Sequence, residues 1–394
     1  MKKRALFREL LKYFEHKNAL VITGMRQVGK TTIMKQVYEN CQYPKLWFDF
    51  ENPFDRIIFE KTDYKVIYNY LVAEASSKGK RLVVFIDEIQ NFPDITRIIK
   101  YFIDHYGVKF IVTGSSNYYL RNLFPESLSG RKFLFELPPL SFQEFLFFKE
   151  KKEDIETSAA DFSKSISEQS ELNSLRYEFE YSEYLQYGGF PEVVTTPDNA
   201  TKKLILTNIL KSFFEKDIRL LSDLKDIREL RDLILLLVPR TGNMLDVTKL
   251  ASELGVNRVK VYDYLELLQG TFFIKLIPKY SSKPGSRVAG GKKVYFSDTG
   301  ILNVLGSVTE GQLFENCIAN QLSLYGDLSF YNHRNTAEID FILDGKRGFE
   351  VKLKADANDL TRLRFLAEKL KLKEYYLISR NTGFKEKVIF PASL

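Results

Sequence analysis

Apolar residues in the first part of the chain are grouped in a pattern typical of a buried parallel sheet alternating with helices. Apolar positions spaced as on one helix face over Lys3–Phe14 predict an amphipathic helix. Short apolar runs at Ala19–Thr23, Arg81–Ile86 and Lys109–Thr113 predict strands covered on both faces. The alternation predicts an α/β domain over residues 1–150.

A second pattern, further along, is helical and then strand-like. Leu204–Ile218 and Ile227–Val238 have helical spacing. Asp246 is suited to cap a short helix, Gly255 to form a tight turn, and Asn257 to cap the helix that follows. This is the outline of a helix-turn-helix.

Two predicted strands, Phe272–Tyr280 and Lys292–Phe296, flank a Gly- and Ser-rich stretch after these helices, which predicts a winged helix. Leu267–Ser297 contains six Lys or Arg residues and no Asp or Glu. A basic hairpin beside a basic helix start is typical of phosphate contact and favours DNA binding, although a winged helix that serves as a protein-docking or lid module, with a solvated charged loop, gives the same pattern. The residues expected to contact DNA are Arg258, Lys260, Lys283, Arg287, Lys292 and Lys293.

The C-terminal part has helical spacing over Gly311–Leu324 and then a predicted hairpin. Asp340 lies on its first strand, and Glu350 and Lys352 lie on its second. The two-residue period of a strand places Glu350 and Lys352 on one face. Two carboxylates suit a shared divalent metal, and a lysine suits the orientation of water, although such a pattern also arises in a hairpin with solvated charges.

Composition narrows the class of protein. The chain has 394 residues, a net charge of +7 and only two cysteines, which argues against a disulfide scaffold and suits a reducing cytoplasm. The longest plain apolar run, Leu233–Val238, is far shorter than a membrane span, and no signal peptide is recognised. We therefore expect a cytoplasmic protein with no membrane association.

Length and local charge suggest several domains. Residues 151–180 are acidic and rich in Ser and Glu, which predicts an exposed insertion. The predicted divisions are 1–150 for the α/β core, 151–200 for the acidic insertion and helical junction, 201–300 for the helical and winged-helix domain, and 301–394 for the C-terminal α/β domain.

A phosphate-binding motif follows the first predicted strand. The residues Gly24, Met25, Arg26, Gln27, Val28, Gly29, Lys30, Thr31 and Thr32 match G-x-x-x-x-G-K-[ST] in full, ahead of a segment able to form a helix. Backbone N–H groups of such a loop face phosphate oxygens, and the helix start adds its dipole. Lys30 is expected to reach the β- and γ-phosphates of ATP, and Thr31 to hold Mg²⁺.

Acidic and polar residues follow the other predicted strands of this domain. Asp87 is expected to orient Mg²⁺, and Glu88 to polarise the attacking water, which favours hydrolysis of ATP. Ser115 or Asn117 is a candidate for contact with the γ-phosphate or water, and Arg131 for transition-state stabilisation in cis or in trans; the trans option requires an oligomer. Each of these three has an equally good structural interpretation.

In this order and spacing, GMRQVGKTT, FIDEIQ, IVTGSSN, SLSGR and LSFQEF resemble the AAA+ branch of P-loop ATPases. They resemble in particular a widespread prokaryotic family that joins such a module to a C-terminal domain of unknown function, and YLQYGGFPEVV at Tyr184–Val194 resembles its next segment. The resemblance implies a P-loop NTPase sheet, then a helical and winged-helix region, then a small nuclease-like α/β domain.

The C-terminal hairpin resembles the PD-(D/E)xK nuclease superfamily. That resemblance implies a core of Asp340, Glu350 and Lys352, with Glu315 as the acid from the preceding helix, and a second divalent metal if the site is active. No Pro precedes Asp340, which departs from the superfamily's full pattern. A nuclease fold that only binds DNA or a partner is the rival interpretation.

Three whole-protein hypotheses stay open at this point. The first is an ATPase that couples its nucleotide state to DNA engagement. The second is an ATP-gated, metal-dependent DNA nuclease. The third is an ATP-driven signalling or chaperone-like switch whose C-terminal half binds protein.

Overall fold

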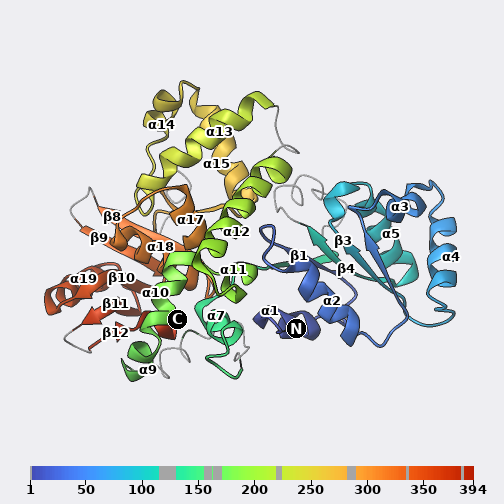
Figure 1. Ribbon diagram of the computed structural model, residues 1–394, viewed down its shortest axis with the longest axis horizontal. Coiled ribbons are helices and arrows are strands. Elements are labelled where there is room, and N and C mark those ends of the chain that lie inside the picture. The colour runs from blue at the N-terminus through green and yellow to red at the C-terminus, as the bar shows by residue number, and fades with distance from the viewer. Residues whose placement is uncertain are drawn as a thin grey trace. The chain divides into compact units, whose positions relative to one another are not determined.

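The computed structural model describes residues 2–114, 130–154, 162, 171–218, 224–281, 290–333, 337–382 and 386–394. The chain divides into two compact units, shown in Figure 1. The first comprises Met1–Pro138 with Gly270–Phe272, and the second comprises Pro139–Gln269 with Phe273–Leu394. Among the described residues, no helix is both long enough and apolar enough to cross a lipid bilayer.

A five-stranded parallel sheet forms the centre of the first unit (Figure 1). Its strands run in the spatial order β2-β3-β4-β1-β5, so β1 lies between β4 and β5. Every residue of β1, β3 and β4 is buried, which agrees with the apolar runs in the sequence. The strands are β1 (Ala19–Thr23), β2 (Lys45–Asp49), β3 (Val83–Asp87), β4 (Lys109–Gly114) and β5 (Lys132–Glu136).

Helices of the first unit bury apolar faces in its core. The longest, α5, has Ile95, Ile99 and Phe102 fully buried and ends at Gly107, which adopts a left-handed conformation as a helix C-terminus favours. The helices are α1 (Ala5–Lys12), α2 (Lys30–Asn40), α3 (Pro53–Arg56), α4 (Tyr64–Glu74) and α5 (Ile95–Tyr106), with short 3₁₀ turns η1 (Ile57–Glu60) and η2 (Ile89–Asn91).

The second unit begins with helices. Two of them, α14 and α15, are joined by Gly255 in a left-handed conformation, and the antiparallel hairpin β6–β7 follows them. The elements are α7 (Phe142–Phe148), α9 (Glu171–Arg176), α10 (Glu178–Tyr187), α11 (Pro191–Thr195), α12 (Asn199–Ser212), the π-helical turn η3 (Phe213–Ile218), α13 (Leu224–Leu237), η4 (Val238–Arg240), α14 (Val247–Leu254), α15 (Arg258–Gly270), β6 (Ile274–Pro278) and β7 (Lys292–Phe296).

A second sheet, of five strands in the order β12-β11-β10-β9-β8, completes this unit. β8, β9 and β10 are antiparallel neighbours, whereas β11 and β12 run parallel to β10. The elements are α17 (Thr299–Leu305), α18 (Glu310–Leu322), β8 (Leu328–His333), β9 (Ala337–Leu343), β10 (Arg347–Ala355), α19 (Ala357–Lys369), β11 (Glu374–Thr382), β12 (Val388–Ile389) and η5 (Pro391–Ser393).

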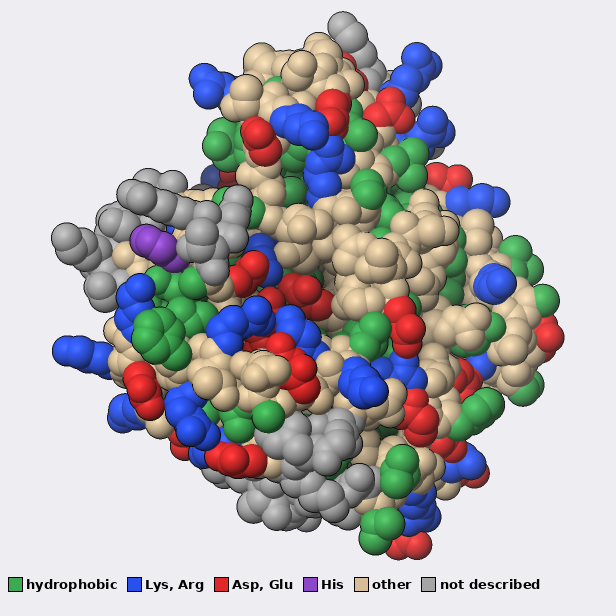
Figure 2. Space-filling view, turned by 90° about the vertical axis from the view of Figure 1, so that its left-hand side faces the viewer, with side chains coloured by type: hydrophobic (Ala, Val, Ile, Leu, Met, Phe, Trp, Pro, Cys, Tyr) green, Lys and Arg blue, Asp and Glu red, His purple; other side chains and the backbone are tan. Residues whose placement is uncertain are grey.

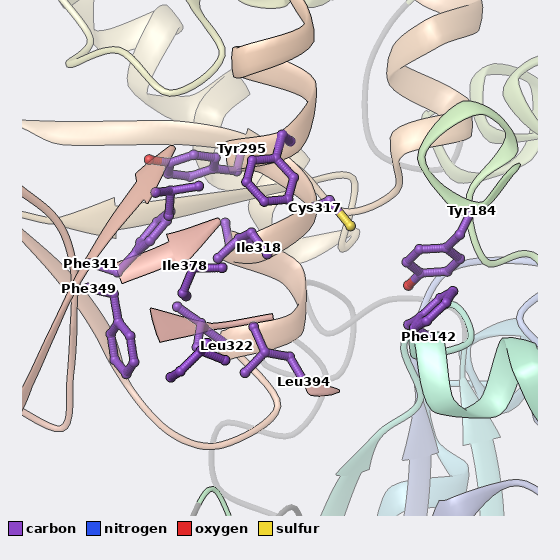
Figure 3. Close-up of a cluster of buried hydrophobic side chains, with 14 of the residues drawn as sticks. Phe142, Tyr184, Tyr295, Cys317, Ile318, Leu322, Phe341, Phe349, Ile378 and Leu394 are labelled. Atoms are coloured by element: carbon purple, nitrogen blue, oxygen red, sulfur yellow. The ribbon is translucent and has the colours of Figure 1, made fainter. Parts of the chain in front are cut away.

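The core of the second unit packs α18 against the inner face of this sheet. Figure 3 shows Ile318 and Leu322 of α18 beside Phe341, Phe349 and Ile378 of the strands. All five side chains are fully buried. The hairpin that carries Asp340, Glu350 and Lys352 is therefore packed against α18 through its buried apolar side chains.

The predicted α/β fold class is confirmed, as are the predicted helices and strands of both units. The acidic stretch 151–180 is helical at its end, where α9 and the start of α10 lie. Most of that stretch lies outside the described residues.

The segment after α10 is held by a buried carboxylate. Asp298, the N-cap of α17, accepts hydrogen bonds from the N–H of Ile301 (3.0 Å) and of Gly189 (2.8 Å). A Cβ on Gly188 would lie 2.2 Å from Asp298 Oδ1, and Gly188 has a φ of +75°. Gly188 is thus explained by its close approach to Asp298, and Gly189 by its close approach to the backbone of Leu140, whose carbonyl oxygen would lie 2.4 Å from a Cβ there.

Asp298 gives the second unit a pH-dependent stability. Burial raises the pKa of Asp298 from 3.8 to about 6, although its backbone hydrogen bonds oppose the shift. Between these values the folded chain retains a proton that the unfolded chain releases, so the free energy of unfolding falls as the pH rises from about 4 to 6. Asp298→Asn should remove about 2–3 kcal/mol of that fall, as measured by urea unfolding across a pH series.

Asp198→Asn provides a control of opposite sign. Asp198 caps α12 on the surface, and its hydrogen bonds to Thr201 lower its pKa. In Asp198→Asn, the free energy of unfolding should rise less steeply with pH than in the parent chain. In Asp298→Asn, it should fall less steeply. Equal pH profiles for Asp298→Asn and the parent chain would contradict the assignment.

Candidate functional site

The loop between β1 and α2 has the backbone shape that its glycines allow. Gly24 has a φ of +147°, and a Cβ there would lie 2.2 Å from the carbonyl oxygen of Leu137. Gly29 has a φ of +98° and is the N-cap of α2. The loop therefore curls tightly ahead of a helix N-terminus, the arrangement that binds phosphate.

Lys30 and Thr31 lie at the first turn of α2, beside the end of β3. The Lys30 ammonium is buried and donates hydrogen bonds to the carbonyls of Gly24 (3.0 Å) and Met25 (2.8 Å). The Thr31 hydroxyl donates to Asp87 Oδ2 at 2.7 Å. The structure thus brings together the two residues expected to hold Mg²⁺, and their oxygen donors fit that ion.

Asp87 is a buried carboxylate with a crowded electrostatic environment. Burial raises its pKa, the charges of Glu88 and Asp49 raise it further, and hydrogen bonds from Thr113 and Thr31 oppose the rise. Asp49 ends β2 in register with Asp87 at the end of β3. A divalent cation at this point would relieve the repulsion that burial intensifies.

Glu88 has a strained backbone conformation that two neighbours support. Its φ of 53° is unusual for a residue with a side chain. Its N–H donates to Thr113 Oγ1 at 3.0 Å, and the same hydroxyl donates to Asp87. The Gln90 amide donates to the Glu88 carboxylate.

Sequence reasoning missed Thr113 and Asp49. Thr113 is the last side chain of the apolar run that forms β4, and it links Asp87 to the backbone of Glu88. The available signal was a polar residue at a strand's carboxyl end, where ligands bind in open α/β sheets. The candidates considered instead, Ser115 and Asn117, lie outside the described residues.

Arg131 lies at the amino-terminal ends of β1 and β5, whereas the phosphate loop follows the carboxyl end of β1. It immediately precedes β5, and its carbonyl accepts from the N–H of Ala19, the first residue of β1. The loop follows the other end of β1, about 13 Å away along the strand. The Arg131 guanidinium also pairs with Asp104 (2.7 Å). This placement does not permit the cis role, so only a role in trans remains as a proposal.

Two other arginines lie near the loop. Arg26, inside it, is 3.9 Å from Glu51. Arg4 is buried and donates to the carbonyl of Val28 in the loop (3.0 Å) and to that of Pro138 (2.9 Å). Arg4 therefore links the loop to Pro138, which follows β5.

The second unit brings together the acidic residues of the C-terminal pattern. Asp340 Oδ2 accepts from the N–H of Val351 (2.8 Å), which ties β9 to β10 beside Glu350. Glu350 Oε1 is 2.9 Å from Lys352 Nζ and 2.5 Å from an Arg362 nitrogen. Burial raises the pKa of Glu350, and the charge of Asp340 adds to the rise.

Glu315 faces the same region from α18, and β7 supplies two of its partners. Tyr295 donates a 2.6 Å hydrogen bond to Glu315, and Lys293 lies 3.4 Å from it. The Lys293 ammonium is also 2.7 Å from Glu338 and 3.9 Å from Asp340. Burial raises the pKa of Glu315, and the charge of Asp340 raises it further.

The metal expected in this second site is only partly matched by the residues present. Carboxylate oxygens are the donors that Mg²⁺ and Mn²⁺ prefer, and Glu350 Oε2 is buried without a hydrogen-bond partner. However, no group of three or more His, Cys, Asp or Glu side chains in the described part of the chain is arranged to hold a metal ion. The carboxylates gather around Lys293 instead.

The residues expected to contact DNA differ in solvent exposure and in ion pairing. Arg258, at the start of α15, and Lys292 are exposed. Lys260 is 2.5 Å from Glu229, and Lys293 is only 5% exposed and paired with carboxylates, so Lys293 offers no surface contact in this conformation. Lys283 and Arg287 lie outside the described residues.

Charges on one face of the molecule are mixed. In Figure 2, Lys and Arg side chains lie among Asp and Glu side chains rather than in one basic patch. Any contact with nucleic acid on this face therefore depends on a few residues rather than on a broad positive field.

Three known families match successive parts of the chain. Residues 16–146 match a family described as an AAA domain. Residues 178–312 match a domain of unknown function, DUF8612, and residues 310–391 match another, DUF4143. The first match covers the phosphate loop, Asp87 and Glu88.

Several proteins are similar over most of the chain. An uncharacterized protein of Methanocaldococcus jannaschii is 27% identical, over 87% of this chain and 76% of its own length. An uncharacterized protein of Haemophilus influenzae is 26% identical, over 82% of this chain and 78% of its own. A Walker-type ATPase of Pyrococcus abyssi has a similar structure, with a TM-score of 0.50 and 14% identity, covering 76% of this chain and 94% of that protein.

The AAA domain match covers the part of the chain that contains the phosphate loop, and the shared fold is that of P-loop ATPases. Nucleotide binding, usually with Mg²⁺, follows from that fold. The geometry at Thr31, Asp87 and Glu88 is consistent with it.

Proposed function

We propose that the chain is a magnesium-dependent ATPase whose nucleotide state controls the engagement of DNA by its second unit. The observation that carries the ATPase half is the contact between the Thr31 hydroxyl and Asp87, with Glu88 following directly on the same strand end. Metal ligands and a candidate base then lie together at the carboxyl edge of the sheet, where open α/β sheets bind ligands.

The residues have distinct roles in hydrolysis. Backbone N–H groups of the loop and the Lys30 ammonium bind the β- and γ-phosphates, while Thr31 and Asp87 hold Mg²⁺. A Mg²⁺ ion held by Thr31 and Asp87 would supply positive charge that neutralises the phosphate oxygens. Glu88 accepts a hydrogen bond from the attacking water and orients it toward the γ-phosphorus. Thr113 keeps the Glu88 backbone beside Asp87.

The DNA half rests on the exposed basic residues of the second unit. Arg258 lies in the first turn of a helix that follows a tight turn, the place where a recognition helix meets DNA, and Lys292 is exposed on the adjoining hairpin. Leu267–Ser297 contains no acidic residue.

Double substitution Arg258→Ala and Lys292→Ala tests this half. We expect DNA affinity to fall about 10-fold near physiological salt, and the salt dependence to weaken by about one to two counterions. Fluorescence anisotropy with a labelled duplex measures both. Lys65→Ala in combination with Lys78→Ala, on the first unit, is the matched control. Unchanged affinity and salt slope would favour a protein-binding role for the second unit.

A metal-dependent nuclease is the second candidate, favoured by the joining of Asp340 to the strand that carries Glu350 and Lys352. With Mn²⁺ and plasmid DNA, Asp340→Asn should lower the cleavage rate by at least about 100-fold, because it removes a metal ligand. Gel electrophoresis measures the rate, and Asp327→Asn, on the exposed turn before β8, is the control. Absence of cleavage by the parent chain would remove this candidate.

A further inference from the structure

Strand β7 directs two side chains at the carboxylates of the C-terminal site. Lys293 and Tyr295 are two residues apart, so they project from the same face of the strand. Both contact Glu315, Tyr295 at 2.6 Å and Lys293 at 3.4 Å. Neither residue belongs to the Asp340, Glu350 and Lys352 motif on β9 and β10. Strand β7 therefore contributes further side chains to the site.

The Lys293 ammonium occupies the position that a cation would take. Three carboxylates, from Glu315, Glu338 and Asp340, lie 2.7–3.9 Å from its nitrogen, and its side chain is only 6% exposed. Burial alone would lower the pKa of Lys293, but these charges outweigh burial and raise it. The lysine is therefore held as a buried cation by its neighbours.

One further atom points to a ligand beyond this lysine. Glu350 is 3% exposed, and its Oε2 atom is buried without a hydrogen-bond partner. A buried carboxylate oxygen without a partner is costly, and a hard divalent cation is the ligand that satisfies it best. The site thus contains oxygen donors for a metal together with resident cations: Lys293 pairs with Glu315, Glu338 and Asp340, whereas Glu350 pairs through its other oxygen with Lys352 and Arg362.

We propose that Lys293 is a built-in counter-ion that competes with a divalent metal, Mg²⁺ or Mn²⁺, for the carboxylates of this site. The metal binds tightly only when Lys293 moves away from Glu315 and Asp340. The proposal relies on the nuclease candidate for the identity of the ligands, but it does not require that the site cleave DNA.

Strand β7 also offers a way to move Lys293. Its backbone pairs with β6 on one side, where Ile277 is the register partner of Lys293. On the other side, Leu245 donates to the carbonyl of Lys292 (2.8 Å) and Gly242 donates to that of Val294 (2.9 Å). The two donors, Gly242 and Leu245, belong to the segment that leads into α14. Displacement of α14 by a bound partner would therefore act on the strand that carries Lys293.

Manganese affinity tests the proposal, with Asp87→Asn present in every chain to remove the metal ligand of the first unit. By isothermal titration calorimetry without nucleotide, Lys293→Met should bind Mn²⁺ at least about 10-fold more tightly than its parent, because a buried competing charge is gone. Lys292→Met, the exposed neighbour on the same strand, should leave the affinity unchanged. Adding Asp340→Asn to Lys293→Met should abolish the gain.

A second pair of variants guards against loss of folding. Lys293→Gln removes the charge but keeps hydrogen bonds to the carboxylates, and it should reproduce the gain in Mn²⁺ affinity. Lys293→Arg retains the charge and should bind Mn²⁺ as weakly as the parent. Mn²⁺ should also raise the Tm of Lys293→Gln more than that of the parent.

The outcomes separate this proposal from the function on which it rests. Mn²⁺ affinity that is equal in Lys293→Gln, Lys293→Arg and the parent would overturn it, as would a gain that survives Asp340→Asn. Tighter metal binding without any DNA cleavage would uphold it and remove the nuclease candidate. DNA cleavage by the parent, with no change of metal affinity in the variants, would uphold the nuclease candidate and remove the proposal for Lys293.

Discussion

Glu88→Gln is expected to retain ATP binding and to lower the rate of ATP turnover by about 10²- to 10⁴-fold. The amide keeps the size of the side chain but cannot accept a proton from the attacking water. The residues that bind ATP and Mg²⁺ remain, because Thr31 contacts Asp87 rather than Glu88. Binding of a fluorescent ATP analogue and the rate of phosphate release measure the two effects separately.

Glu74→Gln is the matched control for this experiment. Glu74 is an exposed residue at the end of α4, so the same chemical change there should leave binding and turnover unaltered. Turnover at the parent's rate in Glu88→Gln would show that another group activates water. Loss of ATP binding would show instead that Glu88 supports the loop.

Gly24→Ala is expected to lose most ATP affinity and to destabilise the first unit. The new Cβ would lie 2.2 Å from the carbonyl oxygen of Leu137, and a φ of +147° is unfavourable for alanine. The loop or the segment after β5 must shift, at a cost of about 3–5 kcal/mol in the free energy of unfolding. Thermal unfolding and titration with an ATP analogue measure the two losses.

Gly107→Ala separates backbone strain from collision. Gly107 also has a positive φ, +63°, but a Cβ there would meet nothing within 4 Å. We expect it to cost about 1 kcal/mol and to leave ATP affinity unchanged, because it lies at the end of α5. Equal effects of the two substitutions would contradict the close packing of Gly24 on Leu137.

The proximity of the residues proposed for the nucleotide site could be predicted from the sequence because their pattern is local. The phosphate loop, Lys30 and Thr31 are contiguous, and Asp87 and Glu88 end an apolar strand. Since the carboxyl ends of parallel strands meet at one edge, their proximity followed from the strand pattern alone. The contact between Thr31 and Asp87 is its outcome.

Features that depend on strand order or on tertiary neighbours were not predictable in the same way. Arg131 was a candidate for a role in cis or in trans, and only the register of β5 against β1 places it at the amino-terminal ends of these strands, away from the phosphate loop. Lys293 lies in a run of basic residues and was expected to contact DNA, yet its side chain is buried. Only the packing of β7 against α18 and β9, which are distant in sequence, reverses that interpretation.

The position of Lys293 has an evolutionary consequence. The two recognised domains of unknown function meet near residue 310, so the ammonium falls in one and the carboxylates of Glu315 and Asp340 fall in the other. Recombination that transferred the later segment alone would leave an acidic cluster without its counter-charge. We therefore expect the two segments to be inherited as one block, and a lineage that loses the lysine to lose or replace an acid at the same time.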